Sequence, residues 1–243
     1  MLLVHEIYLS LQGESTFAGL PCVFVRLTGC NLRCSWCDTA YAFSGGRQMS
    51  IEQVVEAVKK CAAPYQASPA ACGWRLPLVE LTGGEPLLQK EARALMTRLC
   101  DLGHTVLIET SGALDISTVD SRVRRIMDLK CPGSGESAAN LWSNIEHLRD
   151  TDEIKFVIAT VEDYEWAKSR ILACGLAGRC PLLFSWAHPI RGEQRDSSLK
   201  AVPAGQTPIS RRELAERIIA EALPVRFQAQ LHKIIWPPEQ RGV

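Results

Sequence analysis

The fold of this chain is constrained most by an alternation of short apolar runs with longer amphipathic stretches. Runs rich in valine, isoleucine, leucine and phenylalanine predict strands at residues 21–28, 78–81, 105–109, 125–129, 153–159, 181–186 and 225–231. Stretches with a helical spacing of apolar residues predict helices at residues 51–60, 87–102, 161–174 and 210–222. This alternation favours an α/β fold, with a mostly parallel sheet and helices outside it.

Capping residues support these helix boundaries. Ser50 is followed three residues later by Gln53, and Ser210 by Glu213, which is the spacing of a helix N-terminal cap. Gly103 follows the second predicted helix and is expected to end it. Polar or glycine-rich residues recur at the carboxyl ends of the predicted strands, where parallel barrels bind their ligands.

We expect a single domain over residues 1–243. The length suits one ordinary α/β domain, and 47% of the residues are apolar, enough to form a sizeable core. Neither an internal repeat nor a clear linker divides the sequence. Residues 62–77 hold three prolines and several alanines, so we expect a loop insertion there, and residues 232–243 form a C-terminal tail.

The net charge and the N-terminal sequence indicate which binding partners and which cellular compartment to expect. The 27 lysines and arginines balance the 27 aspartates and glutamates, so charge gives no reason to expect a nucleic-acid or membrane partner. The first residues lack the basic leader and apolar stretch of a signal peptide, so we expect a cytoplasmic protein. In that reducing compartment, clustered cysteines indicate metal binding rather than disulfides.

Cys30, Cys34 and Cys37 form a C-x3-C-x2-C motif, the cluster loop (residues 30–37), directly after a predicted strand. Three thiolates can hold three irons of a 4Fe–4S cluster, and because such clusters usually take four cysteines, one iron stays open to another ligand. Zinc is the main rival. A structural zinc site needs four closed ligands, and the nearest further donors, Asp38 and Cys22, do not complete a standard spacing.

The cysteine motif, with the aromatic Trp36 before its last cysteine, resembles the signature of the radical S-adenosylmethionine (SAM) superfamily. The segment Thr82-Gly83-Gly84-Glu85-Pro86 resembles the GGEP motif of that superfamily. The resemblance implies that the open iron chelates SAM and that the reduced cluster cleaves it to a 5′-deoxyadenosyl radical. It also implies the radical SAM fold, an incomplete parallel TIM-like barrel of (β/α)6 type.

Flanking motifs are similar to those of the 7-carboxy-7-deazaguanine synthase family. They are Leu11-Gln12-Gly13-Glu14, Phe24-Val25-Arg26-Leu27, Cys37-Asp38-Thr39, Glu109-Thr110-Ser111-Gly112, Asp128-Leu129-Lys130, Lys155-Phe156-Val157 and Gln230-Leu231-His232-Lys233. This family converts 6-carboxy-5,6,7,8-tetrahydropterin to 7-carboxy-7-deazaguanine in queuosine and other 7-deazapurine biosynthesis. The adenosyl radical takes a hydrogen from C6, the ring contracts with loss of ammonia, and the hydrogen is returned.

The resemblance assigns contacts to the pterin substrate. Arg26 would grip its carboxylate, because a guanidinium fork matches that geometry. Glu14 suits a ring edge that donates several N–H bonds. The full expected substrate set is Leu11, Gln12, Gly13, Glu14, Arg26, Thr82 and His232.

The resemblance also assigns contacts to cofactors. Thr39 matches the magnesium ligand of the family, although Asp38 is the more common type of ligand for Mg2+. The Glu85 carboxylate would accept from the ammonium of SAM. The residues expected near SAM are Trp36, Asp38, Gly84, Glu85, Ser111, Asp128, Lys130 and Ser185. No catalytic side chain is implied beyond the cofactor-generated radical.

Two other functions fit part of the pattern. A radical SAM activase, which makes a glycyl radical on a partner protein, would not need Gln12, Glu14 and Arg26 together. A non-enzymatic metal-binding module would not need a SAM site. The resemblance further implies a flavodoxin- or ferredoxin-type electron donor and a homodimer. The sequence departs from many relatives at Ser15, where they have glycine, and seven residues follow Trp236, which leaves open whether the C-terminal carboxylate contacts substrate.

Overall fold

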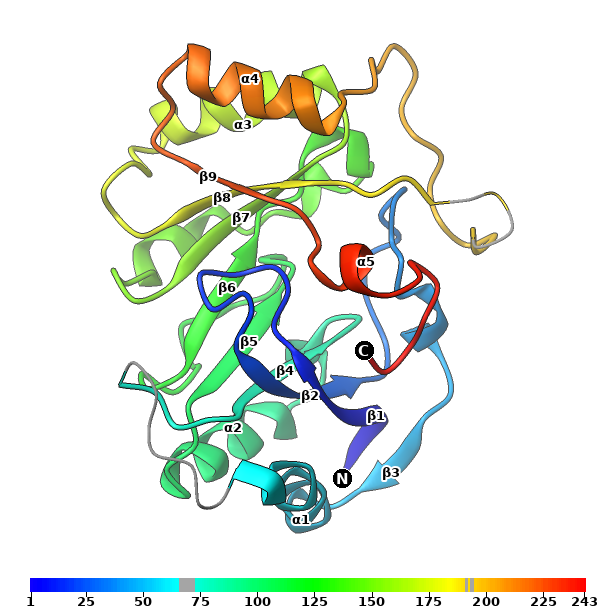
Figure 1. Cartoon of the computed structure of the whole chain (residues 1–243), viewed down its shortest axis with the longest axis vertical. Coiled ribbons are helices and arrows are strands. Elements are labelled where there is room, and N and C mark those ends of the chain that lie inside the picture. The colour runs from blue at the N-terminus through cyan, green and yellow to red at the C-terminus, as the bar shows by residue number, and fades with distance from the viewer. Residues whose placement is uncertain (66–72, 191, 193–194) are drawn as a thin grey trace.

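The computed structural model describes residues 1–65, 73–190, 192 and 195–243, so part of the predicted insertion, residues 66–72, lies outside the described residues. Nine strands of the described chain form one sheet in the order β3-β1-β2-β4-β5-β6-β7-β8-β9 (Figure 1). They are β1 (Leu2–Leu11), β2 (Pro21–Leu27), β3 (Arg47–Met49), β4 (Leu78–Gly83), β5 (Val106–Thr110), β6 (Arg124–Asp128), β7 (Glu153–Ile158), β8 (Leu182–Trp186) and β9 (Arg226–Gln228).

β2 pairs in parallel with β4, and each strand from β4 to β8 pairs in parallel with the next one along the chain. β1 pairs antiparallel with both β2 and β3 at one edge. The sheet therefore runs from β3 at one edge to β9 at the other, which confirms the expected open, mostly parallel architecture.

The sequence did not predict β1 and β3, and it made the last strand too long. β1 is half-buried and carries His5, Glu6 and Tyr8 among its apolar residues, so its apolar signal is weak. The strand expected at residues 225–231 is limited to Arg226–Gln228, and His232 begins the short helix α5 (His232–Ile235) instead of ending a strand.

Helices α1 (Ile51–Ala62), α2 (Glu91–Asp101), α3 (Val161–Ala173) and α4 (Arg211–Ala220) match the four predicted helices. Ser50 caps α1 in a capping box with Gln53, and Ser210 caps α4 by accepting from the Glu213 N–H, as predicted. Short 3₁₀ turns fill the other connections: η1 (Ala40–Phe43), η2 (Ala63–Tyr65), η3 (Pro86–Leu88), η4 (Pro132–Ser134), η5 (Ser137–Ala139) and η6 (Trp142–His147). The helical layer is thus less regular than an ideal (β/α)6 repeat.

Two apolar clusters position the site. The larger one joins the inward faces of α1 to α4 to the sheet. The smaller one, the inner plug, consists of Phe17, Cys22, Leu78, Leu107 and Ile126. Because side chains alternate along a strand, the last four share a sheet face with Arg26, Thr82, Glu109 and Asp128 further along β2, β4, β5 and β6. The plug therefore fills the interior beneath the carboxyl ends of the parallel strands.

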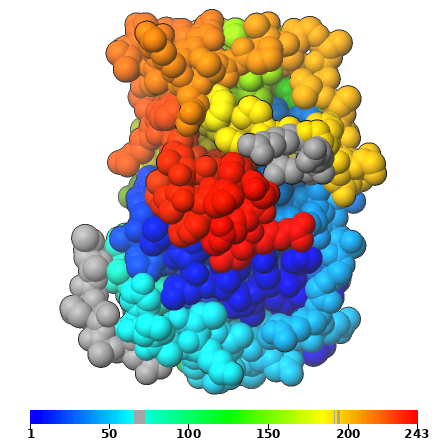
Figure 2. Space-filling view, turned by 45° about the vertical axis from the view of Figure 1, so that its right-hand side comes forward, coloured from blue at the N-terminus to red at the C-terminus, as the bar shows by residue number. Residues whose placement is uncertain are grey.

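The C-terminal segment, residues 225–243, lies on the surface of the molecule. Figure 2 shows it (red) against both the N-terminal strand region (blue) and the chain around β8 (yellow). The C-terminal segment therefore contacts both the N-terminal part of the chain and the chain around β8 (Figure 2). None of the described helices is long and apolar enough to span a membrane.

Candidate active site

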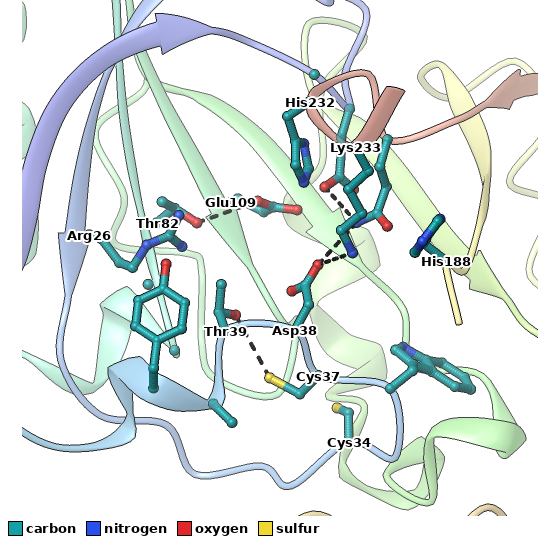
Figure 3. A pocket seen from close by; sticks show the side chains of 18 of the residues that line it. Arg26, Cys34, Cys37, Asp38, Thr39, Thr82, Glu109, His188, His232 and Lys233 are labelled. Carbon is teal, nitrogen blue, oxygen red and sulfur yellow. Dashed lines mark hydrogen bonds and ion pairs between the residues drawn. The ribbon is translucent and has the colours of Figure 1, made fainter. Parts of the chain in front are cut away.

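A cavity of about 690 Å³ opens at the carboxyl ends of the parallel strands. Its lining includes every residue expected at the site except Glu85 and Ser185, and Figure 3 shows how several of them point toward one another. Ser185 is buried within β8, between β7 and β9. The fold thus brings together residues spread from Leu11 to His232.

The cluster loop lies along one side of this cavity, and Cys30, Cys34 and Cys37 all line it. The loop is held from behind: the Ser35 N–H donates to the Ser134 carbonyl at 3.0 Å, and its hydroxyl donates to the Gly133 carbonyl at 2.6 Å. Burial raises the pKa of all three thiols, that of Cys34 to about 11. Three thiols on one braced loop fit a cubane cluster, whose irons would favour their thiolate forms.

Among the described residues, no three His, Cys, Asp or Glu side chains converge closely enough to hold a single metal ion. A 4Fe–4S cluster does not require such convergence, because each thiolate binds a different iron. Thr39, the expected magnesium ligand, lines the cavity, and its Oγ1 lies 3.7 Å from the Cys37 sulfur. Its hydroxyl is a single hard donor, so substrate and water oxygens would have to complete any magnesium site.

The glycines of the Thr82-Gly83-Gly84-Glu85 segment pack against the end of β2 and the start of the cluster loop. A Cβ at Gly84 would lie 2.2 Å from the Gly29 carbonyl oxygen, and one at Gly83 would lie 2.2 Å from that of Leu27. The Glu85 N–H donates to the Gly29 carbonyl at 2.9 Å. These glycines are therefore needed for close approach of two protein backbones, in addition to any approach to a ligand.

Glu85 occupies a different position from the one we expected. It is fully buried behind the cavity, and its carboxylate accepts from the backbone N–H of Leu87 and Ser111 and from the hydroxyls of Thr110 and Ser111. Those partners fill its acceptor positions. The carboxylate is placed to orient Ser111, which does line the cavity, rather than to touch a ligand itself.

Asp128 and Lys130, at the end of β6, form an ion pair of 2.7 Å between Nζ and Oδ2. Burial opposes the charge on Lys130, but Asp128 outweighs it and raises the pKa of the ammonium. The other oxygen of Asp128, Oδ1, is buried without a hydrogen-bond partner in the described chain. An unpartnered buried acceptor in a cavity wall fits a hydroxyl donor such as those of the SAM ribose.

Arg26 is oriented by β1. Its Nε donates to the Glu6 carboxylate at 2.7 Å, and its Nη2 donates to the Tyr8 hydroxyl at 2.9 Å. Tyr41 also donates to Glu6, at 2.9 Å. Burial opposes the guanidinium charge, but the neighbouring oxygens of Tyr8, Tyr41 and Glu6 outweigh it and raise the pKa of Arg26. The guanidinium is thus fixed as a cation that lines the cavity.

Five side chains form the polar floor of the cavity: Gln12, Glu14, Glu80, Glu109 and Lys155. Lys155 binds Glu14 at 3.3 Å and makes a second ion pair with Glu109, whose carboxylate also accepts from Thr82 at 3.4 Å. Burial would raise the pKa of Glu14, but Lys155 and His232 lower it to about 2. The floor therefore holds the Glu14 carboxylate ionised, as its expected role with N–H donors requires.

The Gln12 side chain, expected to contact the substrate, uses most of its hydrogen-bonding groups on protein partners. Its Oε1 accepts from the N–H groups of Glu14 and Ser15 at 2.9 and 3.0 Å, and its Nε2 donates to Glu80 at 3.1 Å. These bonds fix the turn after β1. Contact of the Gln12 amide with a substrate ring would have to use its remaining hydrogen.

The C-terminal segment closes the other side. Gln230 donates to Glu14 at 3.0 Å, the Leu231 N–H donates to the Gly13 carbonyl at 3.2 Å, and Lys233 pairs with Asp38. Burial disfavours the charge on Asp38, but Lys233 outweighs it and lowers the pKa of that carboxyl. Asp38, expected at the cofactor, thus also anchors α5. The last residues, Pro238 to Val243, line the cavity as well.

Sequence reasoning assigned no role to several lining residues, among them Tyr8, Glu80, Glu109, Lys155 and Lys233, although the last three lie in the motifs quoted for the resemblance. Tyr8 lies on the strand that was not predicted. Glu80 stands alone as a charge within an apolar strand segment, and Lys155 shares its segment only with Glu153. Such charges were a usable signal, because buried charges require partners. Lys233 lies in the quoted motif Gln230-Leu231-His232-Lys233, but a lysine near the end of a chain is usually exposed, so no contact was expected for it.

Comparisons with known proteins agree with this site. The Radical SAM superfamily profile matches residues 24–133. The chain is 43% identical to a 7-carboxy-7-deazaguanine synthase of Koribacter versatilis over 99% of both chains, and 41% identical to one of Chlorobaculum tepidum over 99% of this chain and 96% of that one.

Solved structures share the fold. The crystal structure of QueE from Escherichia coli has a TM-score of 0.68 and 21% identity, and the match covers 95% of this chain and 94% of that chain. The structure of Streptococcus suis SuiB bound to S-adenosylmethionine has a TM-score of 0.57 and 15% identity, over 83% of this chain and 48% of that one. The sequence identities to full-length relatives, the superfamily profile and the arrangement of the cysteine loop together show that this chain belongs to the 7-carboxy-7-deazaguanine synthase family of radical SAM enzymes.

Proposed function

We propose that this chain is a radical SAM lyase that converts 6-carboxy-5,6,7,8-tetrahydropterin to 7-carboxy-7-deazaguanine with loss of ammonia. One observation carries the proposal: a single cavity is lined by the three cluster-loop cysteines and also by Arg26 and Glu14, each held in place by its own neighbours. The first set suits a 4Fe–4S cluster and SAM. The second set suits a ligand with a carboxylate and several N–H donors, as the pterin has.

The cofactors would be held by residues that already have suitable surroundings. Cys30, Cys34 and Cys37 would bind the cluster, and the buried Asp128 oxygen would accept a hydroxyl of SAM. When both are bound, the reduced cluster and SAM would supply the 5′-deoxyadenosyl radical of the superfamily. The inner plug and the C-terminal segment would keep water away from that site. Thr39 would bind Mg2+ together with substrate oxygens.

On the substrate side, Arg26 would hold the carboxylate with the part of its guanidinium that is not bound to Glu6 and Tyr8. Glu14 would accept N–H bonds from the ring, and His232 on α5 would close over it from the side of Gly13. Direct contacts of Leu11, Gly13, Thr82 and Gly84 with ligands are part of the same proposal. The activase alternative is not favoured, since full-length relatives are synthases.

Other features stay predictions: the flavodoxin- or ferredoxin-type electron donor, the homodimer, the cytoplasmic location and the single domain over residues 1–243. Anaerobically reconstituted enzyme tests the central proposal. With a reductant, SAM and the carboxytetrahydropterin, it should release 7-carboxy-7-deazaguanine and ammonia while SAM acts catalytically. Cys34→Ala should abolish the product and 5′-deoxyadenosine alike. Stoichiometric zinc without iron, or SAM cleavage that never yields a deazapurine, would overturn the proposal.

A further inference from the structure

Glu80 is a buried carboxyl group in the polar floor to which the resemblance assigns no role. It lies on β4, two residues before Thr82, with 1% of its surface exposed, yet it lines the cavity. It follows Leu78 of the inner plug on the same face of the strand. A carboxyl group in this position needs a reason, since an apolar residue would continue the plug at lower cost.

A continuous series of hydrogen bonds joins Glu80 to the substrate side of the cavity. Its Oε2 accepts from Gln12 Nε2 at 3.1 Å, and Gln12 Oε1 accepts from the Glu14 and Ser15 N–H groups at 2.9 and 3.0 Å. The bond from Nε2 to Glu80 and the two N–H bonds to Oε1 together fix which end of the Gln12 amide faces the turn. If the amide were reversed, its NH2 would face two N–H donors, so the turn that presents Glu14 would lose both bonds.

We propose that Glu80 is a positioning residue for substrate recognition: it fixes the Gln12 amide, and through it the turn that presents Glu14 to the ring of the pterin. The proposal rests on the proposed function, because it takes Glu14 as a substrate contact.

The surroundings of Glu80 also make its charge depend on pH. The groups that face it are Glu109, Lys155, Glu14, Tyr8 and Cys22, from β5, β7, the turn after β1, β1 and β2. Burial, followed by repulsion from Glu109, raises the pKa of Glu80 to about 8. Below that pH the carboxyl is neutral, and the Lys155 ammonium is left to Glu14 and Glu109.

Substrate binding favours the protonated form of Glu80 further, since a ring seated on the floor excludes the water that remains there. The pKa therefore rises on binding, and by linkage the affinity falls once the pH exceeds the value of the free enzyme. Ionised Glu80 would also add a second unneutralised carboxylate below a substrate that is itself an anion.

Calorimetric titration of 6-carboxy-5,6,7,8-tetrahydropterin into anaerobic, cluster-loaded enzyme with SAM and no reductant tests this without turnover. For the wild type, Kd should rise about tenfold between pH 7 and pH 9. Glu80→Gln keeps an acceptor for Gln12 but cannot ionise, so its Kd should stay within about twofold across that range. Glu80→Leu removes the acceptor and should weaken binding about five- to tenfold at pH 7.

Glu162→Gln is the control. Glu162 is a carboxyl group on α3 that accepts from Thr207 and does not line the cavity. That variant should keep the wild-type affinity and pH profile. The role of Glu80 is overturned if Glu80→Gln retains the alkaline loss, if Glu162→Gln removes that loss equally, or if Glu80→Leu binds normally. A wild type that neither binds nor converts the pterin at any pH would instead overturn the proposed function, and this role with it.

Discussion

The guanidinium of Arg26 is bound on two edges by Glu6 and Tyr8 before a substrate arrives. This arrangement fixes the direction in which its remaining N–H groups point. Arg26→Ala should therefore lower kcat/KM for the pterin roughly 10- to 100-fold, the equivalent of a lost charge-assisted hydrogen bond. Cleavage of SAM without substrate should change little, because Arg26 lies on the side of β1 and Tyr41, away from Asp128 and Lys130. Product formation and uncoupled 5′-deoxyadenosine, measured on the same samples, separate the two effects.

Arg26→Lys is the informative companion variant. It keeps a positive charge but loses the planar fork, so it should recover only part of the lost kcat/KM. Full recovery would show that charge alone is needed, and equal losses of SAM cleavage and turnover in Arg26→Ala would point to a disturbed fold instead.

Single residues also show where sequence reasoning stops. The motifs placed Glu85 and Gln12 near the site, and the structure has them there or directly behind it. Motifs could not tell which partner each polar atom would choose. The Glu85 carboxylate is filled by the Thr110 and Ser111 side chains and by backbone N–H groups, and the Gln12 amide by the turn and Glu80. Several of these partners lie 25 to 68 residues away along the sequence, and only the folded chain brings them together.

At the scale of elements, the end of β4 and the cluster loop are held in contact by Gly84. A methyl group there would overlap the Gly29 carbonyl oxygen and the Cys30 Cβ, at 2.2 and 2.6 Å. Gly84→Ala should therefore displace the loop, destabilise the protein by roughly 1–3 kcal/mol and lower its iron content after reconstitution. Iron and sulfide analysis together with thermal unfolding checks this expectation.

Gly192→Ala serves as the control, because a Cβ at Gly192 would meet no atom within 4 Å. It should keep the iron content and stability of the wild type. Full iron content and normal SAM binding in Gly84→Ala would show that the loop accommodates the methyl group, contrary to the steric expectation.

Helix α5 is tied to the residue after the cluster loop by the ion pair of Lys233 and Asp38. The Lys233 side chain is 7% exposed and that of Asp38 35%, so the pair is partly shielded from solvent. Lys233→Met should raise KM for the pterin more than KM for SAM, because α5 also carries His232. In a double-mutant cycle with Asp38→Asn, the two changes should couple by about 1 kcal/mol or more in kcat/KM for the pterin. Strict additivity would reduce the pair to a surface contact.

The predictability of the elements followed their burial. Strands β4 to β8 and helices α1 to α4 were predicted within a few residues, since each has a continuous apolar run or a clear apolar face. β1 was missed because it is half-buried and interrupted by polar residues, and α5 because its four residues are too few to show a helical period. Both missed elements contribute to the cavity, through Tyr8 and through His232 and Lys233.

At the scale of the whole molecule, the site is assembled from the ends of the parallel strands, the turn after β1 and the C-terminal segment. The first part could be predicted, because carboxyl ends of parallel strands meet at one edge. The turn after β1 and His232 could be placed only through the resemblance, and nothing in residues 234–243 indicates where they return. Arg241 lies 4.1 Å from the centre of the Tyr41 ring, a contact between segments 200 residues apart. Closure of the site is therefore a property of the complete fold.

Stability should depend on pH through His104, which lies outside the site between α2 and β5. Burial, followed by repulsion from Arg75 and Lys59, lowers the pKa of His104 from 6.5 to about 4. Between those values the unfolded chain binds a proton that the folded chain does not, so the free energy of unfolding falls as the pH drops from about 6.5 to about 4. The full contribution is present above pH 6.5. His104→Gln cannot titrate and should lose less stability over this range, by on the order of 2 kcal/mol. Urea unfolding at pH 7, 5.5 and 4.5 measures the difference, with the exposed His147→Gln as a control that should follow the wild type. Parallel curves for wild type and His104→Gln would mean that another group governs acid sensitivity.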